Sequence, residues 1–199
     1  MKTFSVTLFL FLFLITSPAY PQEIKVSSPD GQLMVTVFVQ NGEPVYSVAY
    51  NNKIMLENSP LGLITNEGDF SKSMKYTGKS VDTVNKEYRQ DKIKKSNIQY
   101  SANKLICTFE NPKQQQISIA FLVSNNDIAF RYELPQWGER RACVIEKEAT
   151  GYKFPEYTTT FLSSMMAPMG AFARTSPSYE SGYTNDEPMG KPTWQNQGY

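Results

Sequence analysis

The clearest structural signal in the sequence is the stretch Ile117–Leu134, which reads ISIAFLVSNNDIAFRYEL. Large apolar residues alternate with others on both sides of the run 124–127, SNND, whose residue types favour turns. Alternation with a period of two predicts β-strands, and a turn between two such strands predicts a hairpin. The predicted apolar face carries Ile117, Ile119, Phe121 and Val123 in the first strand and Ile128, Phe130, Tyr132 and Leu134 in the second.

The opposite face of this hairpin is less apolar. It carries Ser118, Ala120 and Leu122 in the first strand and Ala129, Arg131 and Glu133 in the second. We therefore expect one face to be wet or only partly covered. A two-stranded ribbon is marginally stable by itself, so its apolar face should be buried under a second sheet.

The N-terminal half shows turn-forming runs about every ten residues. These runs are SSPDG at 27–31, NGEP at 41–44 and NN at 51–52, and the alternating runs beside them are 33–39, 45–50 and 54–56. No helical periodicity appears in this half. The pattern favours an all-β fold, an antiparallel two-sheet β-sandwich of the supersandwich kind, over an α/β fold.

Beyond this half, the pattern is less regular. Residues 59–64 begin a longer connection, and the mixed charges of Lys86–Ser96 indicate a solvated hairpin tip, with a binding patch as the alternative. Further strand material is predicted within 98–109, and closing strands within 142–148 and 152–154.

The chain is thereby divided into three segments: 1–19, a signal peptide; 20–162, the β-sandwich domain; and 163–199, an irregular segment. The last segment mixes Pro, Gly and Met with Tyr and Trp and has no period of two or 3.6. Long segments of this kind lie across another surface or remain disordered.

The N-terminus has the three regions of a secretory signal peptide. A basic start is followed by an apolar run from Phe4 to Ile15 and by small residues up to Ala19, after which we expect cleavage. The alternative, a membrane anchor, needs roughly 20 apolar residues rather than about 12. No cysteine lies near the cleavage site, so we expect no lipid anchor there and a secreted or periplasmic protein. Cys107 and Cys143 could then form a disulfide or remain two buried thiols.

Composition limits the functions that the chain can have. The net charge is +1, with 20 basic and 19 acidic residues among 199, so no electrostatic field attracts nucleic acid or anionic lipid. No motif of a nucleic-acid reader is present. Histidine is absent, which removes the commonest general base and metal ligand.

Several motifs resemble bacterial glycoside hydrolase family 97. The segment Asn126–Tyr132, NDIAFRY, is similar to the GVAFRY-type strand of that family. Other similar segments follow in the family's order: SPDG at 28–31, YSV at 46–48, SPLGL at 59–63, EAT at 148–150 with FP at 154–155, and PSYE at 177–180 with Tyr183. The resemblance covers nearly the whole mature chain and only the family's N-terminal β-sandwich region.

The resemblance implies a large secreted enzyme that hydrolyses α-linked glucosides or galactosides with a (β/α)8 barrel. A barrel of this type needs about 250 residues, and no βαβ alternation is present here. The family's catalytic residues lie on the barrel, so none is named in this sequence, and the chain is interpreted as a fragment. The irregular segment 163–199 is then expected to pack on the missing barrel. The alternatives are a free-standing carbohydrate-binding module and a structural sandwich protein of the envelope.

The resemblance also implies calcium in the complete enzyme. The ion is held by glutamates, mostly from the barrel, and Glu180 in PSYE matches the one from the N-terminal region. Calcium takes six to eight hard oxygen ligands, so a single carboxylate should not bind it tightly in this chain alone. The alternative for Glu180 is an exposed acidic residue in a loop.

Other candidate residues have a simpler explanation. Glu146 and Glu148, two apart, would share a strand face, but solvated carboxylates are commoner than a general acid and base. Four aromatic residues could stack on sugars, although interdomain or core contacts are the commoner use. They are Trp137, Tyr179, Tyr183 and Trp194.

Overall fold

The computed structural model describes residues 22–92, 94, 96–139, 141–163 and 183–192. Over these residues the chain forms strands, turns and connections, with no helix and therefore none long and apolar enough to span a membrane. The strands are β1 Ile24–Ser27, β2 Leu33–Gln40, β3 Glu43–Tyr50, β4 Lys53–Pro60, β5 Leu63–Thr65, β6 Lys75–Arg89, β7 Asn97–Glu110, β8 Gln116–Ser124, β9 Ile128–Glu133, β10 Ile145–Glu148, β11 Thr159–Ser163 and β12 Tyr183–Pro188.

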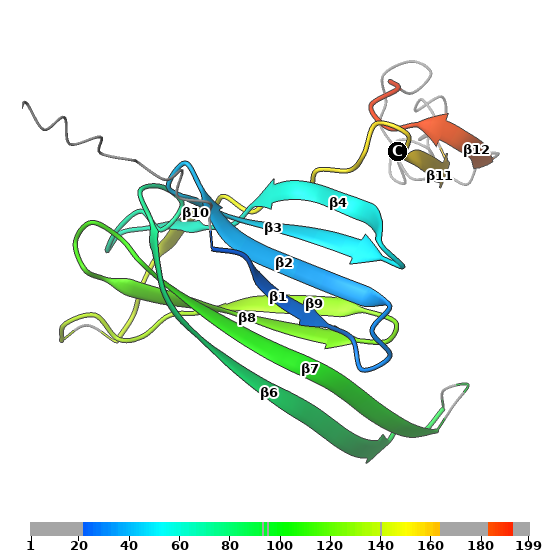
Figure 1. Cartoon of the computed structure of the whole chain (residues 1–199), viewed down its shortest axis with the longest axis horizontal. Coiled ribbons are helices and arrows are strands. Elements are labelled where there is room, and N and C mark those ends of the chain that lie inside the picture. The colour runs from blue at the N-terminus through cyan, green and yellow to red at the C-terminus, as the bar shows by residue number, and fades with distance from the viewer. Residues whose placement is uncertain (1–21, 93, 95, 140, 164–182, 193–199) are drawn as a thin grey trace, which may run out of the picture.

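Two antiparallel four-stranded sheets pack face to face (Figure 1). Their strand orders are β1-β2-β3-β4 and β6-β7-β8-β9, and the two-stranded sheets β10-β5 and β11-β12 complete the described part. Consecutive strands are neighbours within each large sheet because short turns join them. The predicted all-β, antiparallel two-sheet sandwich is confirmed.

The central hairpin is β8 with β9, in the register that its alternation predicts. Ile119 pairs with Tyr132, Phe121 with Phe130 and Val123 with Ile128, so the apolar residues share one face. On the opposite face Arg131 is exposed and donates to the Glu133 carboxylate at 2.7 Å. The prediction of one partly wet face is therefore confirmed.

Tight turns connect β2 to β3 and β3 to β4. Asn41 and Gly42 have φ values of 52° and 81°, and Asn51 and Asn52 have values of 48° and 63°. Two central residues with positive φ produce a turn whose twist matches that of the flanking strands, and asparagine and glycine tolerate this conformation best.

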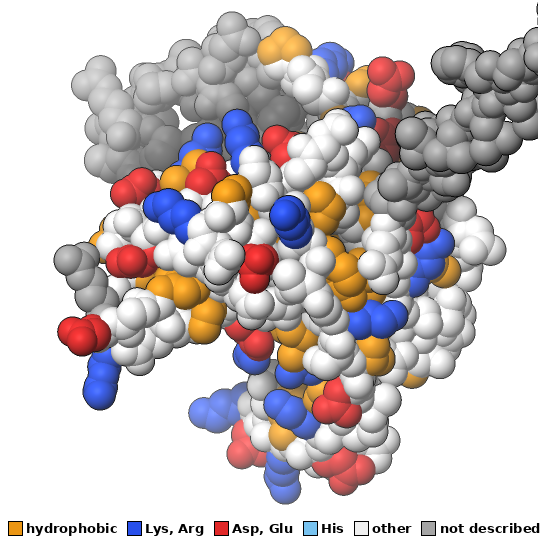
Figure 2. Space-filling view, turned by 60° about the vertical axis from the view of Figure 1, so that its left-hand side comes forward, with side chains coloured by type: hydrophobic (Ala, Val, Ile, Leu, Met, Phe, Trp, Pro, Cys, Tyr) orange, Lys and Arg blue, Asp and Glu red, His pale blue; other side chains and the backbone are white. Residues whose placement is uncertain are grey.

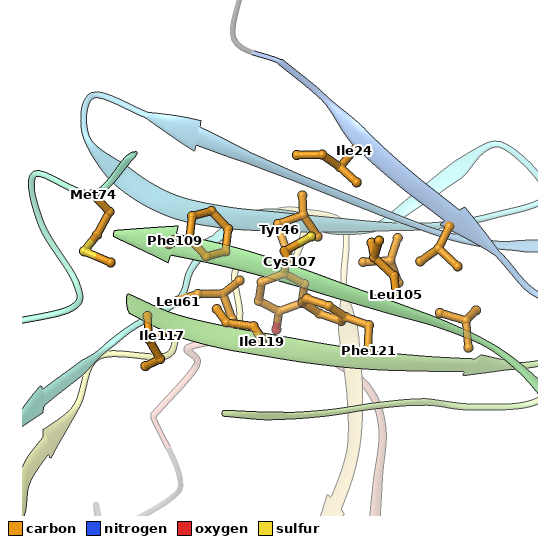
Figure 3. Packing of buried hydrophobic residues seen from close by; sticks show 14 of the residues in the cluster. Ile24, Tyr46, Leu61, Met74, Leu105, Cys107, Phe109, Ile117, Ile119 and Phe121 are labelled. Atoms are coloured by element: carbon orange, nitrogen blue, oxygen red, sulfur yellow. The ribbon is translucent and has the colours of Figure 1, made fainter. Parts of the chain in front are cut away.

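The hydrophobic core lies between the two large sheets (Figure 3). Tyr46 of β3 faces Phe121 of β8 and Phe130 of β9, with ring centroids 6.1 and 5.7 Å apart in tilted arrangements. Such tilted pairs stabilise a core beyond the burial of their area. The N-terminal sheet contributes buried residues such as Val35 and Val37, and the other sheet contributes residues such as Leu105 and Phe109. The core thus joins sequence segments from both halves of the chain.

Strand β6 was not predicted. The sequence led us to expect only a connection between residue 64 and the charged stretch Lys86–Ser96, and that expectation is wrong. Most positions of this long strand are exposed on both faces, so its sequence lacks alternation of apolar residues. It is held instead by a backbone ladder with β7 that continues from Lys75 opposite Glu110 to Arg89 opposite Asn97.

The charged stretch Lys86–Ser96 lies at the tip of the β6–β7 hairpin, where Gln90 N donates to Ser96 O at 2.9 Å. The predicted solvated hairpin tip is confirmed. Acidic and basic side chains are interspersed on the face shown in Figure 2, which fits the balanced composition.

Only part of the predicted closing strands forms. Residues 145–148 pair with β5 as β10, whereas residues 152–154 are not a strand, and that prediction is wrong. Lys153 N donates to the side-chain Oγ of Ser59 at 2.9 Å, and Lys153 O accepts from Glu57 N at 2.8 Å. The Ser59 hydroxyl thus accepts the hydrogen bond that a backbone carbonyl of β4 would accept in a regular ladder. Residues 152–154 therefore do not continue the sheet beside β4.

The segment 163–199 lies mostly outside the described residues. Within it, Ser163 ends β11 and Tyr183–Pro188 forms β12, which pairs with β11. The interpretation of the whole segment as irregular stays a prediction. The predicted signal peptide, residues 1–19, lies outside the described residues as well.

Candidate functional site

The predicted calcium ligand, Glu180, lies outside the described residues, as do Tyr179 and Trp194. Within the ranges that the structure describes, no group of three or more His, Cys, Asp or Glu side chains gathers where a metal ion could be held. The calcium site and its expected ligand Glu180 therefore stay predictions.

Glu146 and Glu148 lie on β10, and both are exposed. The ladder between β10 and β5 shifts register between Ile145 and Lys147, so Glu146 sits in an irregularity and the alternation expected from the sequence is broken there. The structure thus places both carboxylates in solvent, which is the simpler of the two interpretations.

The aromatic candidates in the described part contact other residues of this chain. Trp137 stacks on Phe70, with centroids 4.8 Å apart and planes 13° apart, and its Nε1 donates to Gln116 O at 3.1 Å. Tyr183 stacks on Phe161 between β12 and β11, with centroids 4.9 Å apart. Of the two uses expected for Trp137, sugar stacking and a contact within the protein, the structure shows the contact within the protein.

Both cysteines are free thiols in the structure. Cys107 of β7 lies fully inside the core, and this burial raises the pKa of its thiol to about 12. Cys143 is partly exposed, in the connection before β10. Of the two alternatives left open by the sequence, the structure shows two thiols, one of them buried.

Tyr132 connects three segments of the domain. Its hydroxyl accepts from Gly62 N at 2.8 Å and shares a 2.5 Å hydrogen bond with Thr150 Oγ1. Burial raises the pKa of the Tyr132 hydroxyl above its ordinary value, while the hydrogen bonds with Thr150 and Gly62 oppose that rise. The central hairpin is in this way attached to the loop after β4 and to the segment after β10.

One concave feature of the described residues is an apolar groove of about 320 Å³, here called the β4–β9 groove. It lies between the edge strands β4 and β9 and the connection 152–158. Its lining is Tyr46, Val48, Ile54, Met55, Leu56, Ile128, Phe130, Tyr152, Phe154, Pro155, Tyr157 and Thr158. No charged residue is among them.

A β-bulge shapes this groove. Val48 pairs with Leu56 and Ala49 pairs with Ile54, so Met55 is an extra residue on β4 without a partner on β3. A bulge redirects side chains, and here the neighbours Ile54 and Met55 both line the groove although consecutive strand residues usually face opposite ways.

The tyrosine hydroxyls of the groove are largely used within the domain. Tyr46 donates to Gly151 O at 3.3 Å, and burial raises its pKa to about 12. Tyr157 donates to Ile54 O at 2.8 Å. The lining of the groove is therefore mostly apolar, and the exposed Tyr152 is the third tyrosine in it.

The sequence analysis did not identify this groove. Ile54 and Leu56 appear there as ordinary strand residues, and aromatic residues at 152, 154 and 157 have the same pattern whether they are buried or exposed. Only the register shift at Met55 and the path of the connection bring them together.

Comparison with known proteins gives a consistent result. The family described as "Glycosyl-hydrolase 97 N-terminal" matches residues 26–198. Among curated proteins, a "Probable retaining alpha-galactosidase" of Streptomyces bingchenggensis (strain BCW-1) is 26% identical over 159 residues, which is 74% of this chain and 25% of that protein.

Two solved structures are similar as well. The "Crystal structure of beta-arabinopyranosidase" matches with a TM-score of 0.76 and 48% identity, over 86% of this chain and 28% of that one. A family 97 enzyme from Pseudoalteromonas sp. strain K8, solved with panose and with acarbose, matches with a TM-score of 0.65 and 26% identity, over 72% of this chain and 22% of that one. The chain thus spans about a quarter of the length of these relatives.

Proposed function

Because this chain belongs to the Glycosyl-hydrolase 97 N-terminal family, we propose that it serves as the non-catalytic N-terminal domain of a secreted glycoside hydrolase. The observation that carries the proposal is the family match over residues 26–198, to which the 48% identity with a β-arabinopyranosidase adds support. The catalytic groups belong to a barrel that is no part of these 199 residues.

For the substrate of the complete enzyme, we propose terminal pyranosides with the galacto configuration. β-L-Arabinopyranose has the ring configuration of α-D-galactopyranose without the exocyclic hydroxymethyl group. If the arabinoside is of the L series, the names of two relatives, a β-arabinopyranosidase and a probable α-galactosidase, indicate similar rings. α-Glucosides are the second candidate, favoured by the panose and acarbose complexes of the Pseudoalteromonas enzyme.

The test is a panel of 4-nitrophenyl glycosides with the full-length enzyme and, separately, with the 199-residue chain. We expect the full-length enzyme to cleave the α-galactoside or β-L-arabinopyranoside faster than the α-glucoside, and the chain alone to show no turnover with or without calcium. Turnover by the chain alone, lost on substitution of one of its own residues, would contradict the non-catalytic role.

The alternatives predict different behaviour of the chain alone. A free-standing carbohydrate-binding module would bind oligosaccharides without any partner, whereas a structural envelope protein would bind none and would belong to no enzyme. Calorimetric titration of the chain with panose and with galacto-oligosaccharides distinguishes these two from each other.

We further propose that Glu180 supplies one carboxylate oxygen to a calcium ion held mainly by the barrel. The support is its position in the PSYE segment and the preference of calcium for carboxylate oxygens from separate segments. In the full-length enzyme, Glu180→Gln should weaken calcium binding by calorimetry, while Glu146→Gln, on exposed β10, should not. Equal calcium affinity in both variants would remove this assignment.

Export from the cytoplasm is a separate part of the proposal, supported by the apolar run Phe4 to Ile15 and the small residues before Tyr20. N-terminal sequencing of the exported protein should begin at Tyr20. A protein retaining Met1 would indicate that the run is not removed.

A further inference from the structure

We propose that the outer face of the sheet β6–β9 binds an acidic polysaccharide, one that carries carboxylate or sulfate groups on its sugar rings. The site is a diagonal strip of this face, here called the outer strip. Its cations are Lys86, Lys104 and Arg131, and its aromatic residues are Tyr88 and Tyr100. The inference goes beyond the proposed function, because it assigns a binding site to this chain itself.

The strand register places these side chains on one face of the sheet. Lys86 lies opposite Tyr100, and Tyr88 lies opposite Ile98, in the ladder between β6 and β7. Directly opposite residues point to the same side of a sheet, and successive residues of a strand point to opposite sides. Since Leu105 of β7 is fully buried in the core, the even-numbered positions of β7 and their partners on β6 point away from the core.

A hollow of about 220 Å³ lies in the strip. Small side chains such as Ala120 and Ala129 form its floor, and three long cationic side chains line it as well. The carbon stems of lysine and arginine cover apolar surface while the charged ends stay in water. The hollow therefore offers apolar contact and positive charge together. Its lining is Val84, Lys86, Lys104, Ala120, Leu122, Ala129, Phe130 and Arg131.

The positive charge of the strip is only partly neutralised. Among the described residues, neither lysine of the strip forms an ion pair with a carboxylate. Asp82 lies opposite Lys104 in the ladder, but its carboxylate accepts from Thr83 N at 2.8 Å. Arg131 donates from Nε and Nη2 to the Glu133 carboxylate at 2.9 and 2.7 Å, which orients the guanidinium and leaves Nη1 for a ligand. An anionic ligand would complete these contacts.

Tyrosine rings extend the strip beyond the hollow. Strand β8 pairs with β7 only as far as Ala102, and the β6–β7 hairpin continues past that point (Figure 1). On this extension Tyr88 is 45% exposed and Tyr100 is half-buried. Burial raises the pKa of the Tyr100 hydroxyl, and Asp127 and Tyr88 add to the rise, so the two rings lie near each other. Ring faces of this kind offer large rigid contact area to the C–H faces of a sugar.

The dimensions of the strip fit an extended polymer. Along the ladders the order is Tyr88, Lys86, Lys104 and Arg131, from the hairpin extension to the edge strand β9. With strands about 4.8 Å apart and a rise of about 3.4 Å per residue, the Cα atoms of Lys86 and Lys104 are roughly 14 Å apart and those of Tyr88 and Arg131 roughly 30 Å. A polysaccharide chain of several units can therefore contact all three cations.

Two other uses explain the strip less completely. Lysines on an edge strand hinder pairing with another chain, but only β6 is an edge strand, and Lys104 lies on the interior strand β7. Single-stranded nucleic acid also stacks on aromatic rings. Its affinity depends on a strongly basic surface, however, and the whole chain has a net charge of only +1.

The experiment measures the binding of hexagalacturonate to the 199-residue chain by calorimetry at low salt. We expect the double substitution Lys86→Gln, Lys104→Gln to weaken binding by about tenfold, because each exposed charge contact contributes modestly. The matched control is Lys79→Gln, Lys113→Gln, which removes the same charge from two exposed lysines. Lys79 lies on the other face of β6, opposite Cys107, and Lys113 lies in the turn before β8. The control should bind like the wild type.

A second pair of variants tests the aromatic end of the strip. Tyr88→Phe should keep the affinity because the ring face remains, whereas Tyr88→Ser should lower it by about threefold. All variants should keep the wild-type circular dichroism spectrum and melting temperature, since none of the substituted side chains is buried. If substitution of Lys104 unfolds the chain, Lys86→Gln alone and the two Tyr88 variants still test the strip.

Three further ligands identify what the strip recognises. Maltohexaose and the methyl ester of hexagalacturonate are neutral and should not bind, whereas a sulfated hexasaccharide shows whether sulfate can replace carboxylate. Binding of either anionic probe that only the strip variants weaken supports the proposal. It would be overturned by no binding of either anionic probe, by equal weakening in strip and control variants, or by equally tight binding of the neutral probes. Tighter binding of single-stranded DNA that the strip variants weaken would assign the strip to nucleic acid instead.

These outcomes are separable from those of the proposed function. In the full-length enzyme, Lys86→Gln, Lys104→Gln should leave the cleavage of 4-nitrophenyl glycosides unchanged. An active enzyme whose N-terminal chain binds neither anionic probe would overturn the outer strip alone. A full-length protein without glycosidase activity would contradict the proposed function alone, because the binding measurement does not depend on catalysis.

Discussion

The two cysteines show how strongly the surroundings of a residue set its chemistry. Cys107 is 0% exposed among core residues of both sheets, and burial raises its thiol pKa to about 12. A thiolate is the reactive form, and it is not accessible there at neutral pH. Cys143 is partly exposed in a connection and has no such shielding.

We therefore expect iodoacetamide at pH 8 to label Cys143 and not Cys107 in the folded chain. Mass spectrometry of tryptic peptides measures the labelling at each site. Both cysteines should react after denaturation in guanidinium, which serves as the control. Lack of any labelling in denatured protein without reductant would indicate a disulfide between them.

At the scale of elements, the loop after β4 and the segment after β10 form a tight backbone junction. Ala149 N donates to Gly62 O at 2.9 Å and Gly151 N to Pro60 O at 3.0 Å, while Gly62 N donates to the Tyr132 hydroxyl. Gly62 has a φ of +152°, and a Cβ at this position would lie 2.6 Å from the Cα of Ser71. The junction requires glycine because neighbouring backbone occupies the space of a side chain.

Gly62→Ala should therefore destabilise the chain by roughly 3 kcal/mol, from steric overlap together with an unfavourable φ. Urea unfolding followed by tryptophan fluorescence gives the free energy of unfolding. Gly78→Ala is the matched control, because a Cβ at Gly78 of β6 meets nothing within 4 Å. A Gly62→Ala variant as stable as Gly78→Ala would show that the junction relaxes freely.

For the whole molecule, the core places titratable groups where their charged forms are unfavourable. Tyr46 belongs to the N-terminal sheet and Cys107 to the other, and both lie in the common core (Figure 3). Burial raises the pKa of Tyr46 from its ordinary value of 10.0 to about 12 and that of Cys107 from 9.0 to about 12. The packing of the two sheets is thereby coupled to alkaline pH.

The sign of this coupling follows from proton binding. Between pH 9.0 and about 12 the unfolded chain has lost protons that the folded chain keeps, so the free energy of unfolding decreases as pH rises. Well below pH 9.0, where both groups are protonated in the folded and the unfolded chain, they contribute no pH dependence. We expect urea midpoints to fall across this alkaline window, and to fall less steeply in the Tyr46→Phe, Cys107→Ala double variant. An equal slope in the variant would contradict the assignment to these groups.

The sequence by itself predicted the strands and turns wherever one face of a strand is apolar. The β8–β9 hairpin, the turns at Asn41-Gly42 and Asn51-Asn52 and the two-sheet class are local consequences of alternation and turn chemistry. Strand β6 could not be predicted in this way, because both of its faces are mostly exposed and its apolar residues do not alternate. Backbone pairing with β7 holds it in place.

The surroundings of the candidate site residues were decided by tertiary structure, because they depend on contacts between distant segments of the chain. Glu146 and Glu148 appeared as a pair in the sequence, but a register irregularity leaves them separately solvated, and Trp137 is occupied by Phe70. The β4–β9 groove instead joins residues about 75 and 100 positions apart, which meet only because a bulge turns Met55 outward and a connection crosses the sheet edge. Periodicity reports which face of a strand is apolar, whereas only the packing of distant segments decides which apolar surface remains exposed.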